Sequence, residues 1–155
     1  MGVVTVAPSW LTVLRKEIGV HEISGVEANP RIVEYHRSTS LADRFAISDE
    51  TAWCSSAMNW TVEQAGYIGT NSARARSWLD WGMELSVPTL GAITVIQNRN
   101  TNRFHVALFI TWLLDEESPT HIRLLGGNQA NSVRYSSYAL DAWRVRGYRV
   151  PVLRA

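Results

Sequence analysis

The sequence predicts an α+β fold in which N-terminal helices pack on an antiparallel sheet. Apolar residues recur at helical spacing up to residue 81, and from residue 90 onward they form short runs separated by turn residues. Helices followed by a series of strands are typical of the α+β class. The 155 residues can bury one core, and no repeat or long linker divides them, so we expect a single domain over residues 1–155.

Four helices are expected in the first half of the chain. Asn29-Pro30 has the residues favoured at the N-cap and first position of a helix, and Gly66 is the residue favoured just past a helix end. The short last helix carries Trp78 and Trp81 at helical spacing, so both rings are expected in the core. Ser9 and Asn29 are expected as the N-caps of the first two helices, the third helix is expected to follow Cys54, and the fourth is expected to start at Ser72.

Five strands are expected after Pro88. Residues 98–102 are rich in Asn and predict a turn between the first two strands. The run 105–114 is apolar almost throughout, which predicts a buried central strand. Arginines alternate with Val145 and Gly147 near the C-terminus, as on the exposed side of a strand. The five strands are expected at 90–96, 105–114, 122–128, 133–138 and 143–150.

The charge of the chain does not favour nucleic acid as a partner, and its hydropathy does not indicate a membrane span or a signal peptide. The chain has 15 Lys and Arg against 14 Asp and Glu, a formal net charge of +1, so its charge balance does not favour nucleic acid. No stretch approaches the length of a membrane span. The N-terminal segment lacks a basic region and Pro8 interrupts its apolar run, so we expect no signal peptide. The protein is therefore expected to be cytoplasmic at synthesis.

Cys54 is the only cysteine, and it lies where a polar, acidic loop meets a helix-prone stretch. The unpaired N–H groups at a helix N-terminus lower the pKa of a thiol there and favour the nucleophilic thiolate. Cys54 is therefore a candidate catalytic nucleophile. The alternative is a small buried apolar residue, which is a frequent role of free cysteine.

A cysteine nucleophile needs a base, and the base needs a third group that fixes its tautomer. His105 is the candidate base because it begins the most apolar strand, which would hold it rigidly. Asn128 ends the next strand, so a meander would return it to His105 as the third group. The alternatives are a strand-end histidine bonded to backbone and a turn asparagine. His21, Glu22 and His36 do not form a convincing ligand set, so we expect no metal and no cofactor.

Cys54, His105 and Asn128, in this order along the chain, resemble the papain-like peptidoglycan hydrolases, which include the CHAP amidases and peptidases and their NlpC-type relatives. Within that group the chain is more similar to small single-domain endolysin-like proteins of phages and prophages. The resemblance implies a papain-like α+β fold of the CHAP or NlpC type. It departs at Gly126, where many CHAP domains have glutamate, and at Ala52, where proline is expected. The matching stretches cover nearly the whole chain and are 16–23, 29–32, 49–55, 73–79, 88–93, 105–107 and 125–129.

The resemblance also implies roles for individual residues. Cys54 would be the nucleophile, His105 the general base and acid, and Asn128 the orienting residue in cleavage of a peptidoglycan amide bond. That bond is either the glycan–peptide amide or one within the stem peptide or its cross-link. The expected substrate-binding residues are Asp49, Glu50, Trp53 and Gln129. Asp49 and Glu50 could bind a stem-peptide amino group, or they could be solvated charges before a helix.

The expected partner is peptidoglycan. A monomeric enzyme of this kind, made in the host cytoplasm without a signal peptide, would reach the periplasm with the help of a holin-type membrane partner and act there on a Gram-negative-type wall. Two alternatives stay open. One is a non-catalytic module that binds cell-wall glycan through many exposed tryptophans, and the other is an antibacterial effector amidase of the same fold.

Overall fold

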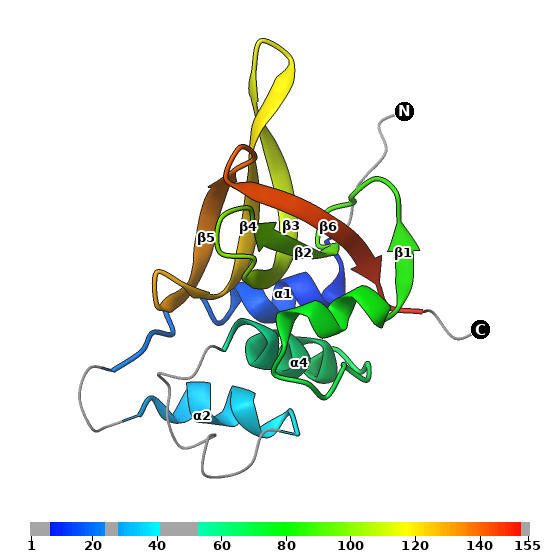
Figure 1. Ribbon diagram of the computed structural model, residues 1–155. Coiled ribbons are helices and arrows are strands. Elements are labelled where there is room, and N and C mark those ends of the chain that lie inside the picture. The colour runs from blue at the N-terminus through cyan, green and yellow to red at the C-terminus, as the bar shows by residue number, and fades with distance from the viewer. Residues whose placement is uncertain (1–6, 24–27, 41–52, 153–155) are drawn as a thin grey trace.

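The computed structural model describes residues 7–23, 28–40 and 53–152, which form helices packed on one six-stranded antiparallel sheet (Figure 1). The predicted α+β class is confirmed. The helices are α1 (Ser9–Arg15), α2 (Pro30–Arg37), α4 (Cys54–Gln64) and the 3₁₀ helix η1 (Ala75–Asp80). The strands are β1 (Met83–Leu85), β2 (Ile93–Asn98), β3 (Phe104–Asp115), β4 (Ser118–Gln129), β5 (Ser132–Ala139) and β6 (Trp143–Val150).

The helix ends follow the predicted chemistry in two places. The side chain of Asn29 accepts a hydrogen bond from the backbone N–H of Arg31 at 2.9 Å and caps α2, with Pro30 at the first position. Gly66 follows the end of α4 with φ of +92°, a left-handed backbone that glycine adopts without cost.

Two predicted helix starts are wrong. Ser9 is the first residue of α1 and Pro8 is its N-cap. Ser72 precedes η1, which begins at Ala75, because the Ser72 hydroxyl instead accepts from the N–H of Arg74 at 3.1 Å and closes a turn.

The sheet has the strand order β1-β6-β2-β3-β4-β5. Strands β2 to β5 form the expected meander, and β6 returns to pair with β2. The short strand β1 was not expected. The prediction of a fully buried β3 holds only for its first half, because the strand is exposed toward its C-terminal end. There β3 and the start of β4 project as a two-stranded ribbon beyond the helices (Figure 1).

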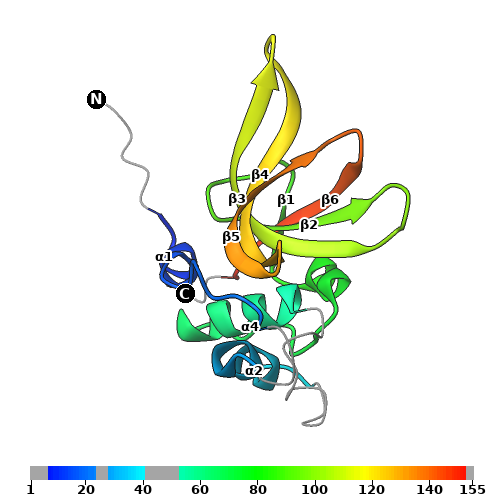
Figure 2. The ribbon, with the colours of Figure 1, turned by 90° about the vertical axis from the view of Figure 1, so that its left-hand side faces the viewer.

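Two clusters of buried side chains lie on the two faces of the sheet. The larger joins the helices to the sheet, and Figure 2 shows α1, α2 and α4 on one side of the strands. Its members include Leu11, Ile32, Met58 and Leu108, and the predicted core residue Trp78 is fully buried among them. The second cluster packs on the opposite face and includes Ile96, Phe109, Ile122, Leu124 and Tyr148.

The segment after α1 runs along the outer edge of β5. Val133 donates its N–H to the carbonyl of Val20 at 2.8 Å and accepts from the N–H of Gly19 at 3.1 Å. Glu22 donates its N–H to the carbonyl of Asn131 at 2.9 Å. These bonds hold residues 19–22 beside the turn that joins β4 to β5. Among the residues described, no helix has the length and apolar character needed to cross a membrane.

Candidate active site

Cys54 is the first residue of α4, so the start of this helix positions its thiol. The side chain is 8% exposed. Helix α4 packs against β3 and β4, and buried hydroxyl groups anchor its first turn. Ser55 donates its hydroxyl to the carbonyl of Ser72 at 2.7 Å and accepts from the indole N–H of Trp78 at 2.9 Å. His36 of α2 contacts the hydroxyl of Ser56 at 2.8 Å through Nδ1. The nucleophile candidate therefore stands on a rigid support.

His105, the second residue of β3, is 8% exposed, and its side chain interacts with the Cys54 thiol. Burial alone would raise the pKa of the Cys54 thiol. The charge and hydrogen bond of His105, together with backbone hydrogen bonds from Val106 and Ser55, outweigh burial and lower that pKa. Burial alone would likewise lower the pKa of His105, but Cys54 and then Gln129 raise it. The geometry thus favours a thiolate beside an imidazolium, the activated state of a cysteine nucleophile.

The neighbour of the His105 ring is Gln129, and this differs from the expected pairing with Asn128. Nε2 of His105 lies 2.9 Å from Oε1 of Gln129. Gln129 is only 2% exposed, and its side-chain amide also bonds the carbonyls of Leu124 at 3.3 Å and Arg134 at 2.6 Å. The side chain of Gln129, predicted to bind substrate, is therefore enclosed, and its polar atoms are engaged by His105 and by backbone carbonyls.

A register shift in β4 explains why Gln129 takes the place expected for Asn128. The pairing of β4 with β5 shifts between Gly126 and Gln129, and Asn128 has φ of +57°. This left-handed residue interrupts the alternation of side chains along the strand. A continuous two-residue period was assumed in placing Asn128 beside His105, so the prediction was displaced by one position.

Tyr138 on β5 is a further member of the site that the sequence did not single out. Its hydroxyl donates to Oε1 of Gln129 at 3.0 Å and lies 3.2 Å from Nε2 of His105. The ring packs against the His105 ring at 5.5 Å between centroids and against Trp143 at 5.1 Å. The only signal for Tyr138 is the pairing of β5 with β4, which single-chain periodicity does not provide.

Trp53 was expected to line a substrate groove, and its side chain is fully buried in this structure. The indole N–H donates to Oε1 of Glu22 at 2.8 Å, and the ring stacks on Tyr35 at 6.0 Å between centroids. It also lies against Gly127, where an added Cβ would come within 2.6 Å of Trp53 Cζ3. These contacts hold Trp53, the residue before Cys54, between the 19–22 segment and β4. Asp49 and Glu50 lie outside the described residues.

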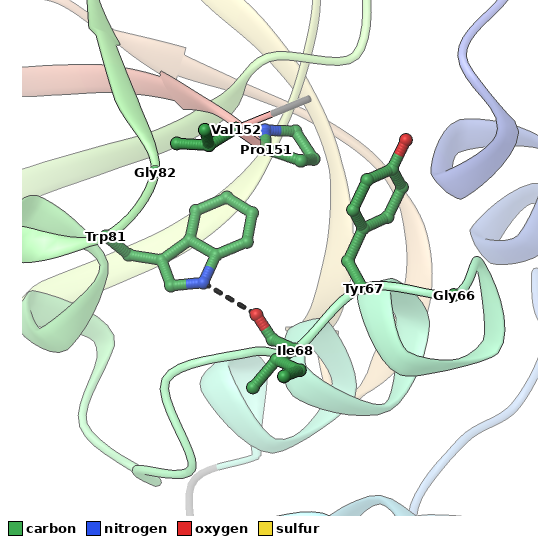
Figure 3. A pocket seen from close by; sticks show the side chains of 7 residues that line it. All are labelled: Gly66, Tyr67, Ile68, Trp81, Gly82, Pro151 and Val152. Atoms are coloured by element: carbon green, nitrogen blue, oxygen red, sulfur yellow. Dashed lines mark hydrogen bonds between the residues drawn. The ribbon is translucent and has the colours of Figure 1, made fainter. Parts of the chain in front are cut away.

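A pocket with a volume of about 380 Å³ lies away from Cys54, at the other end of α4. Tyr67 and Trp81 face each other across it, and the Trp81 indole bonds the carbonyl of Ile68 at 2.9 Å (Figure 3). An 11-residue helix is roughly 16 Å long, so this pocket is not part of the Cys54 site. Trp81, expected in the core, is half-buried and lines this pocket.

Among the described residues, no cluster of three or more His, Cys, Asp or Glu side chains could hold a metal ion. Comparison of the chain with protein-family models, with curated proteins and with solved structures gave no significant match. The functional interpretation therefore depends on the geometry of Cys54, His105 and Gln129 and on the sequence resemblance.

Proposed function

We propose that the protein is a cysteine hydrolase that cleaves an amide bond of bacterial peptidoglycan. The observation that carries the proposal is the interaction between two nearly buried side chains, Cys54 at the start of α4 and His105 at the start of β3. Two nearly buried groups whose pKa values are shifted toward the charged pair are a frequent arrangement in catalytic sites.

In the proposed reaction the Cys54 thiolate attacks the carbonyl carbon of the amide. The backbone N–H of Cys54, at the first position of α4, helps to stabilise the oxyanion that forms. The His105 imidazolium gives its proton to the leaving amine, and a thioester remains. His105 then takes a proton from water, and the resulting hydroxide attacks the thioester. The C–S bond breaks, which frees a carboxylic acid and restores the Cys54 thiolate beside the His105 imidazolium.

The choice of substrate is supported by the resemblance to CHAP and NlpC-type peptidoglycan hydrolases. The arrangement of a nucleophile-bearing helix against an antiparallel sheet that carries the base is compatible with their papain-like fold. In this proposal Cys54 is the nucleophile, His105 is the base and acid, and Gln129 takes the orienting role first assigned to Asn128. Entry into the periplasm would depend on a holin-type membrane partner.

The tryptophans do not favour the alternative of a glycan-binding module. All seven lie among the described residues; four are buried and the other three are half-buried. A binding surface built on many exposed indole rings is thus not present in the described part of the chain. The buried Cys54–His105 pair also has no role in such a module.

Digestion of purified sacculi tests the proposal and separates it from the alternatives. Wild-type protein should release soluble fragments and clear a peptidoglycan zymogram, while Cys54→Ala should do neither. Mass spectrometry of the fragments identifies the new amine and carboxyl termini and hence the bond that is cut. Intact sacculi after incubation with folded wild-type protein would refute the proposal. Neighbouring genes would separate a lysin from an effector, because a holin gene suggests lysis and an immunity gene suggests an effector.

A further inference from the structure

Gln129 determines which nitrogen of His105 carries the permanent proton. The amide nitrogen of Gln129 points at two carbonyls, those of Leu124 and Arg134, so the amide orientation is fixed and Oε1 must face His105. An amide oxygen can only accept a hydrogen bond. Nε2 of His105 is therefore the protonated nitrogen, and Nδ1 is left to exchange a proton with the Cys54 thiol.

The Tyr138 hydroxyl is the second group that touches Nε2. It donates its own proton to Oε1 of Gln129 at 3.0 Å, so toward Nε2, at 3.2 Å, it can present only an oxygen lone pair. The Nε2–H group is thus shared between two acceptors. Both hydrogen bonds from Nε2–H become stronger when the ring is positively charged, because hydrogen bonds from a charged donor are stronger than neutral ones.

We propose that Tyr138 is a positioning residue that stabilises the His105 imidazolium, and through it the Cys54 thiolate, by accepting a hydrogen bond from Nε2–H. This extends the role of the site under the proposed function, but the protonation of the Cys54–His105 pair can be measured without any substrate. The hydroxyl itself stays protonated, because burial and then the charge of Cys54 raise the pKa of Tyr138. It therefore remains a donor to Gln129 throughout catalysis.

The groups that can influence this arrangement come from four elements. Cys54 faces His105 from α4, and Gln129 reaches it from β4. Arg134, on the same strand as Tyr138, acts on the phenol and lowers its pKa, against the larger effect of burial. Trp143 of β6 packs on the Tyr138 ring and carries no charge. A change at the Tyr138 hydroxyl is therefore read out at one titrating pair, that of Cys54 and His105.

Titration of the Cys54–His105 pair in a hydroxyl-deleted variant tests the proposal. Tyr138→Phe keeps the ring that packs on His105 and Trp143 and removes only the oxygen. The ¹⁵N chemical shifts of His105 are recorded against pH, which gives the pKa of the imidazolium. We expect that pKa to fall by about one unit in Tyr138→Phe, which is a tenfold lower ratio of charged to neutral pair, since a hydrogen bond to the charged ring is lost.

Tyr135→Phe is the matched control. It removes a phenol oxygen from the same strand, where the Tyr135 hydroxyl contacts only Arg15, at 3.2 Å, among the contacts described for it. We expect the imidazolium pKa of His105 in Tyr135→Phe to equal that of the wild type. An unshifted imidazolium pKa in Tyr138→Phe, or equal shifts in both variants, would overturn the proposal.

A second measurement needs no variant and decides the matter if Tyr138→Phe does not fold. The ¹⁵N chemical shifts of His105 in the wild-type protein should show Nε2 protonated at every pH and Nδ1 as the nitrogen that titrates. A neutral ring with its proton on Nδ1 would contradict the inference. Intact sacculi together with a lowered imidazolium pKa in Tyr138→Phe would refute the proposed function and leave this inference standing.

Discussion

Nε2 of His105 and Oε1 of Gln129 are 2.9 Å apart, and this contact joins the start of β3 to the end of β4. It places an acceptor behind the imidazole on the side away from the thiol. The ring is therefore held in one orientation, with one nitrogen committed to the protein and the other available to Cys54.

Replacement of Gln129 should reduce activity more than replacement of Asn128. Gln129→Ala removes the nearer acceptor of Nε2–H and leaves only the Tyr138 hydroxyl. A lost hydrogen bond to a charged group costs about 1.5–3 kcal/mol, so we expect a roughly tenfold to hundredfold loss of sacculus digestion. Asn128→Gly is the control, because glycine keeps the left-handed backbone observed there. It should retain most of the activity. The reverse order of losses would restore Asn128 as the orienting residue.

Loss of either member of the Cys54–His105 pair should abolish or nearly abolish hydrolysis. Cys54→Ala removes the nucleophile and should leave only background clearing. His105→Ala removes the proton-transfer group, whose contribution is roughly a hundredfold to ten-thousandfold. Iodoacetamide should inactivate the wild type, whereas EDTA should have no effect. Inhibition by EDTA that added metal reverses would speak for a different mechanism. Circular dichroism of both variants checks that the fold survives.

The pH dependence of activity should follow the pair. The lowered pKa of Cys54 and the raised pKa of His105 define the window in which thiolate and imidazolium coexist. Activity should rise with pH through the thiol pKa and fall through the imidazolium pKa, giving a bell-shaped profile. Alkylation needs only the thiolate, so its rate should already be substantial below the ordinary thiol pKa of 9.0. A rate that rises only near pH 9.0 would argue against the ion pair.

The free energy of unfolding should also rise and then fall with pH, as the activity does. Below pH 6.5 the unfolded chain protonates both groups, whereas the native pair holds one proton down to the lowered thiol pKa, so stability falls as the solution becomes more acid. Above pH 9.0 the unfolded chain has lost both protons and the native imidazolium keeps one, so stability falls again. Between pH 6.5 and pH 9.0 the folded and unfolded states each hold one proton on this pair, so the pair does not make stability depend on pH. Thermal unfolding of Cys54→Ala against pH, compared with the wild type, should show weaker acid and alkaline limbs.

The contact between Trp53 and Gly127 predicts a structural route to inactivation. In Gly127→Ala the new Cβ would lie within 2.6 Å of the buried indole and 2.9 Å of Ala57 Cβ, so the start of α4 must move. We expect a loss of about 1–3 kcal/mol in unfolding free energy from overpacking, together with reduced activity. Gly147→Ala meets only the end of the Leu79 side chain, at 3.1 Å, and should cost less. Equal unfolding midpoints would contradict the tight contact.

Much of the fold could be predicted from local chemistry. The cap at Asn29, the glycine after α4 and the bounds of β6 all depend on residues close in sequence. Strand β1 could not be predicted in this way, because three residues carry too little periodicity and owe their conformation to pairing with β6.

In the candidate site, too, some positions follow from local sequence and others depend on how the strands pair. The positions of Cys54 and His105 at the starts of their elements follow from local sequence. The partner of His105 depends on a register shift between β4 and β5, and Tyr138 enters only because those strands pair. A one-residue irregularity reverses which side chain faces the ring, and nothing in the letters Gly126-Gly127-Asn128-Gln129 states which of the last two residues will do so.

The segment 19–22 has two tasks, and they cannot be separated by cutting it away. It pairs with the first residues of β5 on the outer edge of the sheet, where another chain could otherwise add a strand, and through Glu22 it holds Trp53 next to Cys54. Removal of the chain up to and including Glu22 would expose the backbone edge of β5 to pairing with other chains, and it would also remove the hydrogen-bond partner of Trp53. Aggregation and inactivity would then appear together, so the inactivity of such a truncated protein would not test the roles of the catalytic residues.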